Sequence, residues 1–134
     1  MSPALVDTDI LSEFLRGTEI VVDNAKKYLE NYDSINFSII TYYEILNGLL
    51  YKDARNQLKR FLDFAELNKI LPLTVSATKR AAEIYANLRK TGEPIGHTDC
   101  LIAGVALTNN LQLITNNLGH FRRIEGLEIV NWLK

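Results

Sequence analysis

Hydrophobic and polar positions vary along the chain with two different periods. Short apolar runs rich in β-branched residues predict strands, and longer segments with apolar residues three or four positions apart predict amphipathic helices. Between positions 19 and 32, for example, apolar residues follow helical spacing, with charged side chains on the opposite face: Ile20, Val21, Ala25, Tyr28 and Leu29. The predicted strands cover residues 4–7, 34–40, 69–74, 111–115 and 127–133. The predicted helices cover residues 8–17, 19–32, 41–52, 53–67, 75–92 and 96–110, with a short turn or helix at 116–121.

The predicted strands and helices alternate from one end of the chain to the other. This order is typical of an α/β fold, in which a parallel sheet is covered by helices on its faces. We therefore expect a central parallel sheet of about four to five short strands flanked by helices. No linker, internal repeat or low-complexity segment interrupts the pattern, so residues 1–134 are expected to form a single domain.

Composition narrows the classes of function. Hydrophobic residues make up 47% of the 134 residues, which is enough for a real core. The net charge of -1 argues against a surface that is positive overall, so nucleic acid would have to be bound through a local patch, a metal or a partner. The single cysteine, Cys100, excludes an internal disulfide. No apolar run reaches the roughly 20 residues needed to span a bilayer, and no signal peptide is indicated. We therefore expect a cytoplasmic protein that does not bind membranes.

Two glycines lie inside predicted helices, where most other residues would be more stable. Gly48 and Gly104 each weaken their helix by about 1 kcal/mol relative to alanine. Close packing of another backbone, or of a second subunit, would explain them.

Polar residues directly follow two of the predicted strands. Asp7 ends the first strand, and Thr115, Asn116 and Asn117 lie at the end of the fourth. In open parallel sheets, ligands bind outside the carboxyl ends of the strands, beside the helices that begin there. This rule places these residues at the candidate site, together with acids at the beginnings of nearby helices.

Each acid at this edge also has a purely structural explanation. Asp7 is a good N-cap for the helix that follows, and Asp9 in its first turn complements the helix dipole. Thr41 and Glu44 have the spacing of a capping box ahead of an apolar run. A capping glutamate would still lie at the mouth of its helix, where it can face a site.

Asp99 begins a mostly apolar helix, where an unpaired carboxylate would be costly. Its partner is a divalent cation, a lysine or a backbone amide, or else Asp99 caps the helix. Asn117 is explained as a turn or N-cap residue. His97 and His120 lie near the same edge without the spacing of a metal-binding pair, and we expect His120 to pack or to cap a helix.

Considered together, these acids indicate more than capping. Several carboxylates at one place repel each other and do not all ionise unaided. A hard cation such as Mg²⁺ or Mn²⁺ removes this conflict and prefers oxygen ligands. Such an ion can polarise a phosphate and activate a water molecule, which is the chemistry of phosphodiester hydrolysis without a protein nucleophile.

Four segments resemble, in order, the four motif blocks of PIN-domain proteins, and most closely those of VapC-type toxins from prokaryotic toxin–antitoxin pairs. They are LVDTDILSEFL, SIITYYEILNGL, PIGHTDCLIAGVAL and LITNNLGHF, and they extend over nearly the whole chain. The resemblance implies a PIN-like three-layer fold and a metal-dependent endoribonuclease. It also implies an RNA substrate, a homodimer and a cognate VapB-like antitoxin that blocks the site. DNA would be bound only indirectly, through that antitoxin.

The resemblance also assigns roles to residues of this chain. The catalytic positions of the family match Asp7, Glu44, Asp99 and Asn117, and the metal ligands among these are Asp7 and Asp99. Asn117 is neutral where many relatives carry an acid, so a second metal would bind weakly or only with substrate. Thr115 matches the threonine that supports the first aspartate, and Asp9 matches a variable position, which makes it auxiliary.

Three other interpretations of the early acids are weaker. A PIN-like fold can serve as a non-catalytic RNA-binding or scaffold module, but such a module has no need to retain three acids. A haloacid-dehalogenase-like phosphatase also begins with D-x-D, yet Ile10 and Leu11 stand where that family has Gly and Thr or Val. A receiver domain would place its phosphoacceptor aspartate at the end of the third strand, and ILPLT contains none.

Overall fold

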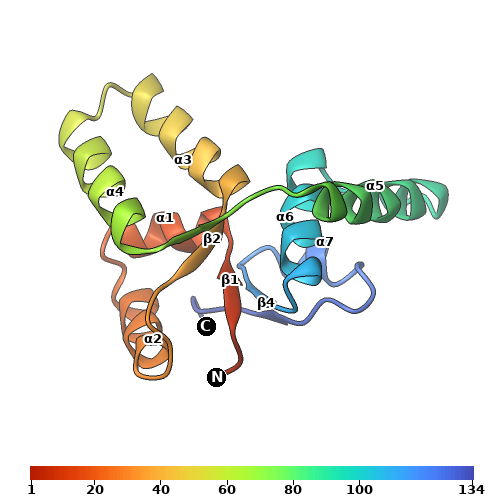
Figure 1. The fold of residues 1–134 in the computed structure, drawn as a ribbon, viewed down its shortest axis with the longest axis horizontal. Helices are drawn as coiled ribbons and strands as arrows, with labels where there is room; N and C mark the ends of the chain where they lie inside the picture. The colour runs from red at the N-terminus through yellow and green to blue at the C-terminus, as the bar shows by residue number, and fades with distance from the viewer.

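The computed structural model describes all 134 residues and contains five strands and seven helices (Figure 1). The strands are β1 (Ala4–Val6), β2 (Asn36–Ser38), β3 (Lys69–Leu71), β4 (Gln112–Ile114) and β5 (Ile129–Val130). The helices are α1 (Thr8–Leu15), α2 (Glu19–Leu29), α3 (Ile39–Tyr51), α4 (Arg55–Leu67), α5 (Val75–Lys90), α6 (His97–Thr108) and α7 (Leu118–Phe121). None of these helices combines the length and the apolar character that crossing a membrane requires.

All strand pairs are parallel, and the order of strands in the sheet is β3-β2-β1-β4-β5. The chain runs outward from β1 to β2 and β3, and then returns to place β4 on the other side of β1. The direction of winding therefore reverses between β1 and β4, where Val6 is paired with Ile114. Such a switch point opens a crevice at the carboxyl ends of the strands. The predicted α/β fold is confirmed.

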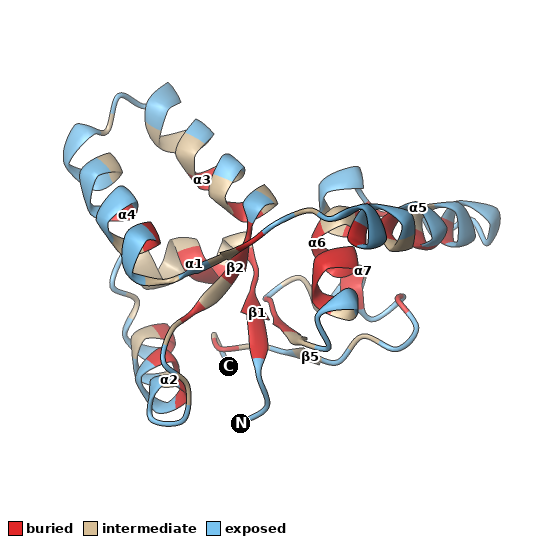
Figure 2. Ribbon diagram, viewed as in Figure 1, coloured by how far each residue is buried: buried red, intermediate tan, exposed pale blue.

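Both faces of the sheet are buried, which explains why the strands are apolar throughout. Leu5 and Leu113 belong to a core formed with α5 and α6 on one face. Val6 and Ile114 belong to a second core formed with α1, α2, α3 and α4 on the other face. Figures 1 and 2 show these two groups of helices on opposite sides of β1, with the buried residues turned toward the sheet. The expected three layers are thus present.

The contact between α5 and α6 depends on small residues. A Cβ atom at Gly104 would lie only 2.4 Å from the backbone oxygen of Ala77 and 3.1 Å from the Cβ of Ala81. Close backbone packing, one of the two explanations offered for the helical glycines, is therefore correct for Gly104. It does not apply to Gly48, because a Cβ there would have no atom within 4 Å.

Strand β2 is shorter than the predicted 34–40, and the predicted capping box is wrong. Ser38 is the N-cap of α3, and its hydroxyl accepts a hydrogen bond from the backbone N–H of Thr41 at 3.1 Å. Thr41 therefore lies in the first turn, and Glu44 lies one turn further along the helix. Ser38 is paired with Leu71, the last residue of β3, so further strand residues would have no partner on that side.

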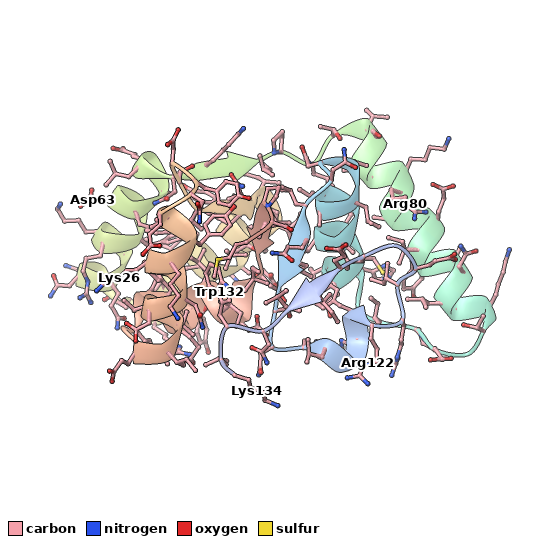
Figure 3. The ribbon with its side chains drawn as sticks, turned by 90° about the horizontal axis from the view of Figure 1, so that it is seen from below. Lys26, Asp63, Arg80, Arg122, Trp132 and Lys134 are labelled. Carbon is pink, nitrogen blue, oxygen red and sulfur yellow. The ribbon has the colours of Figure 1, made fainter.

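Strand β5 is also shorter than the predicted 127–133. It ends at Val130, which is paired with Ile114 at the end of β4. The following residues leave the sheet, and the indole of Trp132 lies in the core, 5.8 Å from the ring of Tyr28 (Figure 3). Helix α4 likewise begins at Arg55 and not at Asp53, which has a positive φ of 52°.

The packing of the two glycines leads to opposite expectations for alanine. Gly104→Ala should lower the free energy of unfolding by about 1–3 kcal/mol, because the methyl group overlaps the backbone of α5. Gly48→Ala should raise it by up to about 1 kcal/mol, because alanine favours the helix and the added methyl group meets open space. Urea unfolding followed by the fluorescence of Trp132, the only tryptophan, measures both. If both substitutions changed the free energy of unfolding equally, the close contact between Gly104 and the backbone of α5 would be contradicted.

Candidate active site

Asp7 lies at the centre of the site because it directly follows the central strand, beside the switch point. Its backbone N–H donates to the carbonyl oxygen of Ile114 at 2.8 Å, which continues the pairing of β1 with β4. The side chain of Asp7 is only 5% exposed. A carboxylate this far from water needs partners that offset the loss of its hydration.

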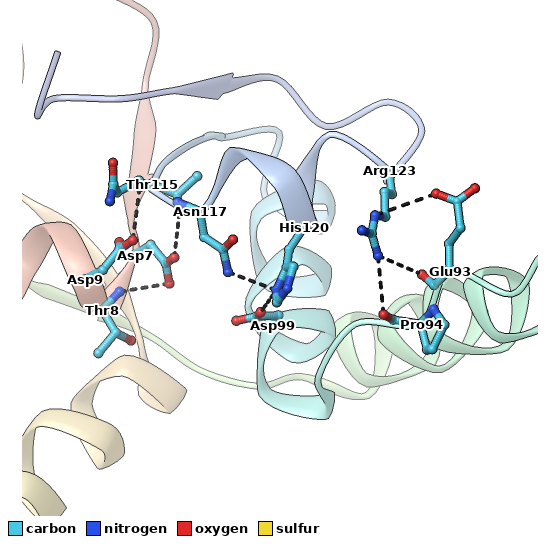
Figure 4. A network of polar contacts seen from close by, with 11 residues as sticks. Asp7, Thr8, Asp9, Glu93, Pro94, Asp99, Thr115, Asn117, His120 and Arg123 are labelled. Carbon is cyan, nitrogen blue, oxygen red and sulfur yellow. Dashed lines mark hydrogen bonds and ion pairs between the residues drawn. The ribbon is translucent and has the colours of Figure 1, made fainter.

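Two hydrogen bonds hold the carboxylate of Asp7. One oxygen accepts from the backbone N–H of Thr8 at 2.8 Å, so Asp7 is the N-cap of α1, as the structural explanation of this residue predicted. The other oxygen accepts from the hydroxyl of Thr115 at 2.8 Å. The oxygen of that hydroxyl accepts in turn from the backbone N–H of Asn117 at 3.0 Å (Figure 4). Capping and site formation therefore use the same residue.

Asp9 connects α1 with the loop after β4. Its two carboxylate oxygens accept hydrogen bonds from the backbone N–H groups of Ile10 at 2.7 Å and of Asn116 at 3.0 Å. Burial is the largest cause of the raised pKa of Asp9, and these two hydrogen bonds oppose it. Asp9 thus adds a second acidic group beside Asp7 and fixes the loop that carries Asn117.

The charge of Asp7 is poorly compensated. The pKa of its carboxyl is raised to about 7, mainly by burial and next by the neighbouring charge of Asp9. The hydrogen bonds from Thr115 and Thr8 lower this pKa only in part, and Asp99 adds to the repulsion. Near neutral pH the carboxyl of Asp7 is therefore only partly ionised, and no cationic side chain stabilises its charged form.

Glu44 joins the site through Thr8, a residue that the sequence patterns did not single out. The hydroxyl of Thr8 donates to a carboxylate oxygen of Glu44 at 2.6 Å and lies 2.9 Å from the hydroxyl oxygen of Thr41. Because Thr8 directly follows Asp7, this contact ties α3 to the beginning of α1. The only feature of the sequence that could have indicated Thr8 is its hydroxyl side chain, directly after the predicted strand at residues 4–7.

Asp99 has a partner that the sequence analysis did not consider. A carboxylate oxygen of Asp99 lies 3.0 Å from Nδ1 of His120, and the side-chain nitrogen of Asn117 lies 2.9 Å from the same ring nitrogen (Figure 4). The expectation that His120 packs or caps a helix is therefore wrong. When Nδ1 carries a proton it donates to Asp99, and Asn117 must then turn its amide oxygen toward the ring.

Comparison with known proteins assigns the chain to a family. The sequence pattern of the PIN domain matches residues 4–127. The chain belongs to the PIN-domain family. Ribonuclease VapC1 of Haemophilus influenzae is 30% identical over 132 residues, which cover 97% of this chain and 98% of that protein.

Solved structures show the same fold over nearly the whole chain. The structure of DNA-bound VapBC from Salmonella typhimurium aligns with a TM-score of 0.87 and 28% identity, covering 98% of this chain and 99% of that one. The structure of VapBC2 from Rickettsia felis, bound to a DNA fragment from its promoter, aligns with a TM-score of 0.86 and 27% identity. That alignment covers 96% of this chain and 98% of the other.

The predicted site residues of this PIN domain form one connected network. Asp7, Asp9 and Thr115 lie at its centre, Asn117 links Thr115 to the contact between Asp99 and His120, and Glu44 joins through Thr8. The hydrogen bonds show that these residues lie together in the structure. Their catalytic roles stay predictions. His120 and Thr8 are the two members that sequence reasoning missed.

The residues present fit a hard divalent cation. No three His, Cys, Asp or Glu side chains come together closely enough to hold a metal without other ligands. Mg²⁺ does not need such a group, because it is commonly held by one or two carboxylates and keeps several waters. Asp7 and Asp99 could supply oxygen ligands, and a cation would relieve the repulsion that Asp9 and Asp99 exert on Asp7.

The raised pKa of Asp7 predicts how stability depends on pH in the absence of metal. The folded pKa of about 7 lies above the ordinary value of 3.8, so the folded state binds more protons between these values. This carboxyl therefore lowers the free energy of unfolding as pH rises from about 4 to about 7. The stability gained by Asp7→Asn in EDTA should be about 3 kcal/mol larger at pH 8 than at pH 5.

Urea unfolding at the two pH values measures this difference, and Asp23→Asn is the matched control. Asp23 is an exposed residue of α2 that forms no ion pair, so its substitution should have the same small effect at both pH values. If Asp7→Asn raised the free energy of unfolding by the same amount at both pH values, the raised pKa of Asp7 would be contradicted.

Proposed function

We propose that this PIN domain is a VapC-type endoribonuclease that hydrolyses RNA phosphodiester bonds with Mg²⁺ or Mn²⁺ bound at Asp7 and Asp99. The observation that carries the proposal is the buried, poorly compensated carboxylate of Asp7 at the switch point, with Asp99 acting on it from α6. The similarity to ribonucleases named VapC over nearly the whole chain supports the substrate class.

The residues around the two proposed ligands have positioning roles. The N–H of Thr8 and the hydroxyl of Thr115 fix both oxygens of Asp7, so its orientation is set before any ligand binds. His120 fixes one oxygen of Asp99. The bound cation would polarise the phosphate and make an attacking water more acidic.

Glu44 is the residue best placed to handle a proton. Its Oε1 accepts the hydroxyl of Thr8, whereas Oε2 takes part in no hydrogen bond within the protein. Thr8 therefore holds the carboxylate in place while leaving one oxygen free to accept a proton from water. Asn117 acts through its amide on His120 and through its backbone on Thr115, so we propose that it positions the site.

We further propose that the protein acts in the cytoplasm as a homodimer and is inhibited by a VapB-like antitoxin. The structural relatives are VapBC complexes bound to DNA, which supports both the antitoxin and indirect contact with DNA. The net charge of -1 is consistent with leaving DNA binding to the partner.

Cleavage of RNA should depend on both metal and the two aspartates. Purified protein is incubated with total cellular RNA in Mn²⁺ or in EDTA, and the new RNA ends are sequenced. We expect discrete cuts in Mn²⁺ and none in EDTA, with the rate reduced by about two orders of magnitude or more in Asp7→Asn and Asp99→Asn. Asp23→Asn serves as control and should cut normally. Cleavage by folded Asp7→Asn protein, or cleavage in EDTA, would refute the proposed mechanism.

Metal binding can be measured without activity. Mg²⁺ or Mn²⁺ at about 100 times its dissociation constant should stabilise the wild type by about 2.7 kcal/mol, seen as a rise in melting temperature. The same metal should leave the melting temperature of Asp7→Asn unchanged. NaCl at equal ionic strength controls for screening of the acids. An equal rise in wild type and variant would place the metal elsewhere.

A further inference from the structure

Two aromatic rings are stacked at the beginning of the helix that carries Asp99. The imidazole of His97, the first residue of α6, lies on the ring of Tyr85 from α5, with 4.2 Å between the ring centroids and 27° between the ring planes. The close approach of α5 and α6 at Gly104 brings the two rings together. Neither ring belongs to the hydrogen-bonded network of the active site, so the pair needs an explanation of its own.

The two rings differ in how much of them water reaches. Tyr85 is half-buried and packs against the core that α5 and α6 form on one face of the sheet. His97 is exposed, and the nitrogens of its ring form no hydrogen bond or ion pair within the protein. A ring that is supported on one side and accessible to solvent can receive a further planar group in a stack.

The stacked pair adjoins the acidic site without being part of it. His97 and Asp99 are two residues apart, which is about 3 Å along the axis of α6. Successive residues of a helix are rotated by about 100°, so these two side chains leave α6 on nearly opposite sides. The side chain of Asp99 turns toward His120 (Figure 4). A polymer that is bound at Asp99 and continues across the beginning of α6 would therefore meet the ring of His97.

An unpaired cation lies on the same face of α5 as the stack. Arg89 follows Tyr85 by four residues, so the two side chains are neighbours on the surface of this helix. Arg89 is exposed and takes part in no ion pair. Proteins that bind single-stranded nucleic acids combine these two elements, because an aromatic ring receives a base while a cation binds the backbone.

We propose that a nucleobase of the RNA, beside the phosphate that is cut, stacks on His97, with Tyr85 behind the imidazole and Arg89 at the adjoining phosphate. The proposal rests on the ribonuclease function proposed above and extends it to how the substrate strand is held. Every base has a π-face, so this contact positions the strand without selecting its sequence.

The surroundings of His97 favour a single planar group over the surface of another protein. The residues on either side of it, Gly96 and Thr98, are exposed and carry no apolar side chain that could extend the contact. A helix of a protein partner requires a continuous apolar groove, whereas a base requires one ring and a cation for its phosphate.

RNA binding is measured in EDTA, so that no RNA is cut, by the fluorescence anisotropy of a labelled single strand of about 12 nucleotides. His97→Ala should bind about tenfold more weakly than the wild type, because it loses one stacked base. His97→Phe should bind within about twofold of the wild type, since phenylalanine keeps an aromatic ring at this position. Thr98→Ala is the matched control on the neighbouring exposed residue and should bind as the wild type does.

Two further measurements distinguish stacking from a general effect on the fold. Stacking quenches fluorescent adenine analogues, so RNA that carries one should lose fluorescence on binding to the wild type and to His97→Phe, and less on binding to His97→Ala. Arg89→Gln should make the plot of log K against log[salt] shallower by about 0.7. Lys79→Gln removes the same charge from an exposed position about 15 Å away on α5 and should leave the slope unchanged. Melting temperatures verify that each variant is folded.

Cleavage of the same RNA in Mn²⁺ separates the stacking proposal from the nuclease. Weaker binding by His97→Ala together with recovery by His97→Phe supports the stack, and if the wild type then cuts no RNA, only the nuclease proposal fails. Equal binding by the wild type, His97→Ala and Thr98→Ala overturns the stack, whether or not the wild type cuts RNA. Binding by His97→Phe as weak as that by His97→Ala overturns it as well, because an aromatic ring would then not be sufficient. Absence of RNA binding by the wild type also overturns the proposal.

Discussion

The arrangement of the candidate site depends on the burial of one carboxylate at the end of the central strand. Asp7 can stay in this position because the parallel pairing of β1 with β4 places Thr115 beside it and because α1 begins with the N–H of Thr8. These contacts orient the carboxylate without neutralising it, so its pKa stays near 7. Every other member of the site is placed relative to this residue, through Asp9, Thr8 or Thr115. A sheet with another strand order would separate Asp7 from the loop that carries Asn117.

The sequence was informative wherever function followed from the end of a strand. Asp7 and Thr115 were placed correctly because a buried parallel strand is recognisable from its apolar residues, and because parallel strands end at a common edge. The ends of strands were harder to predict, because they depend on where the neighbouring strand ends. The β-branched Ile39 and Ile40 favour a strand, but the adjacent β3 already ends opposite Ser38, and Ile40 packs as a helical residue against the core with α5 and α6. Tertiary context thus overrode local propensity.

The contacts of Asp99 and Glu44 could not be predicted from pattern for a different reason. His120 meets Asp99 across 21 residues, and Thr8 meets Glu44 across 36, so each contact depends on how two helices sit over the sheet. Hydrophobic periodicity indicates which face of a helix is buried. It does not indicate how the polar residues at the ends of two helices lie relative to each other. The spacing of the two histidines excluded a local metal-binding pair. It gave no indication that His120 orients the carboxylate of Asp99.

The placement of charge explains how a nearly neutral chain can combine an acidic site with a polyanionic substrate. Spread evenly, a net charge of -1 would neither attract a phosphate backbone nor concentrate a cation. The fold instead gathers Asp7, Asp9 and Asp99 at the switch point and leaves Lys52 and Arg60 unpaired along α3 and α4. Thr8 and Glu44 belong to both regions, so the acids that would hold the metal lie beside the unpaired cations. Helix α3 connects them physically: one face carries Glu44, the bare backbone at Gly48 and Lys52 on successive turns. The spacing along this helix therefore determines how far the cation of Lys52 lies from the carboxylate of Glu44.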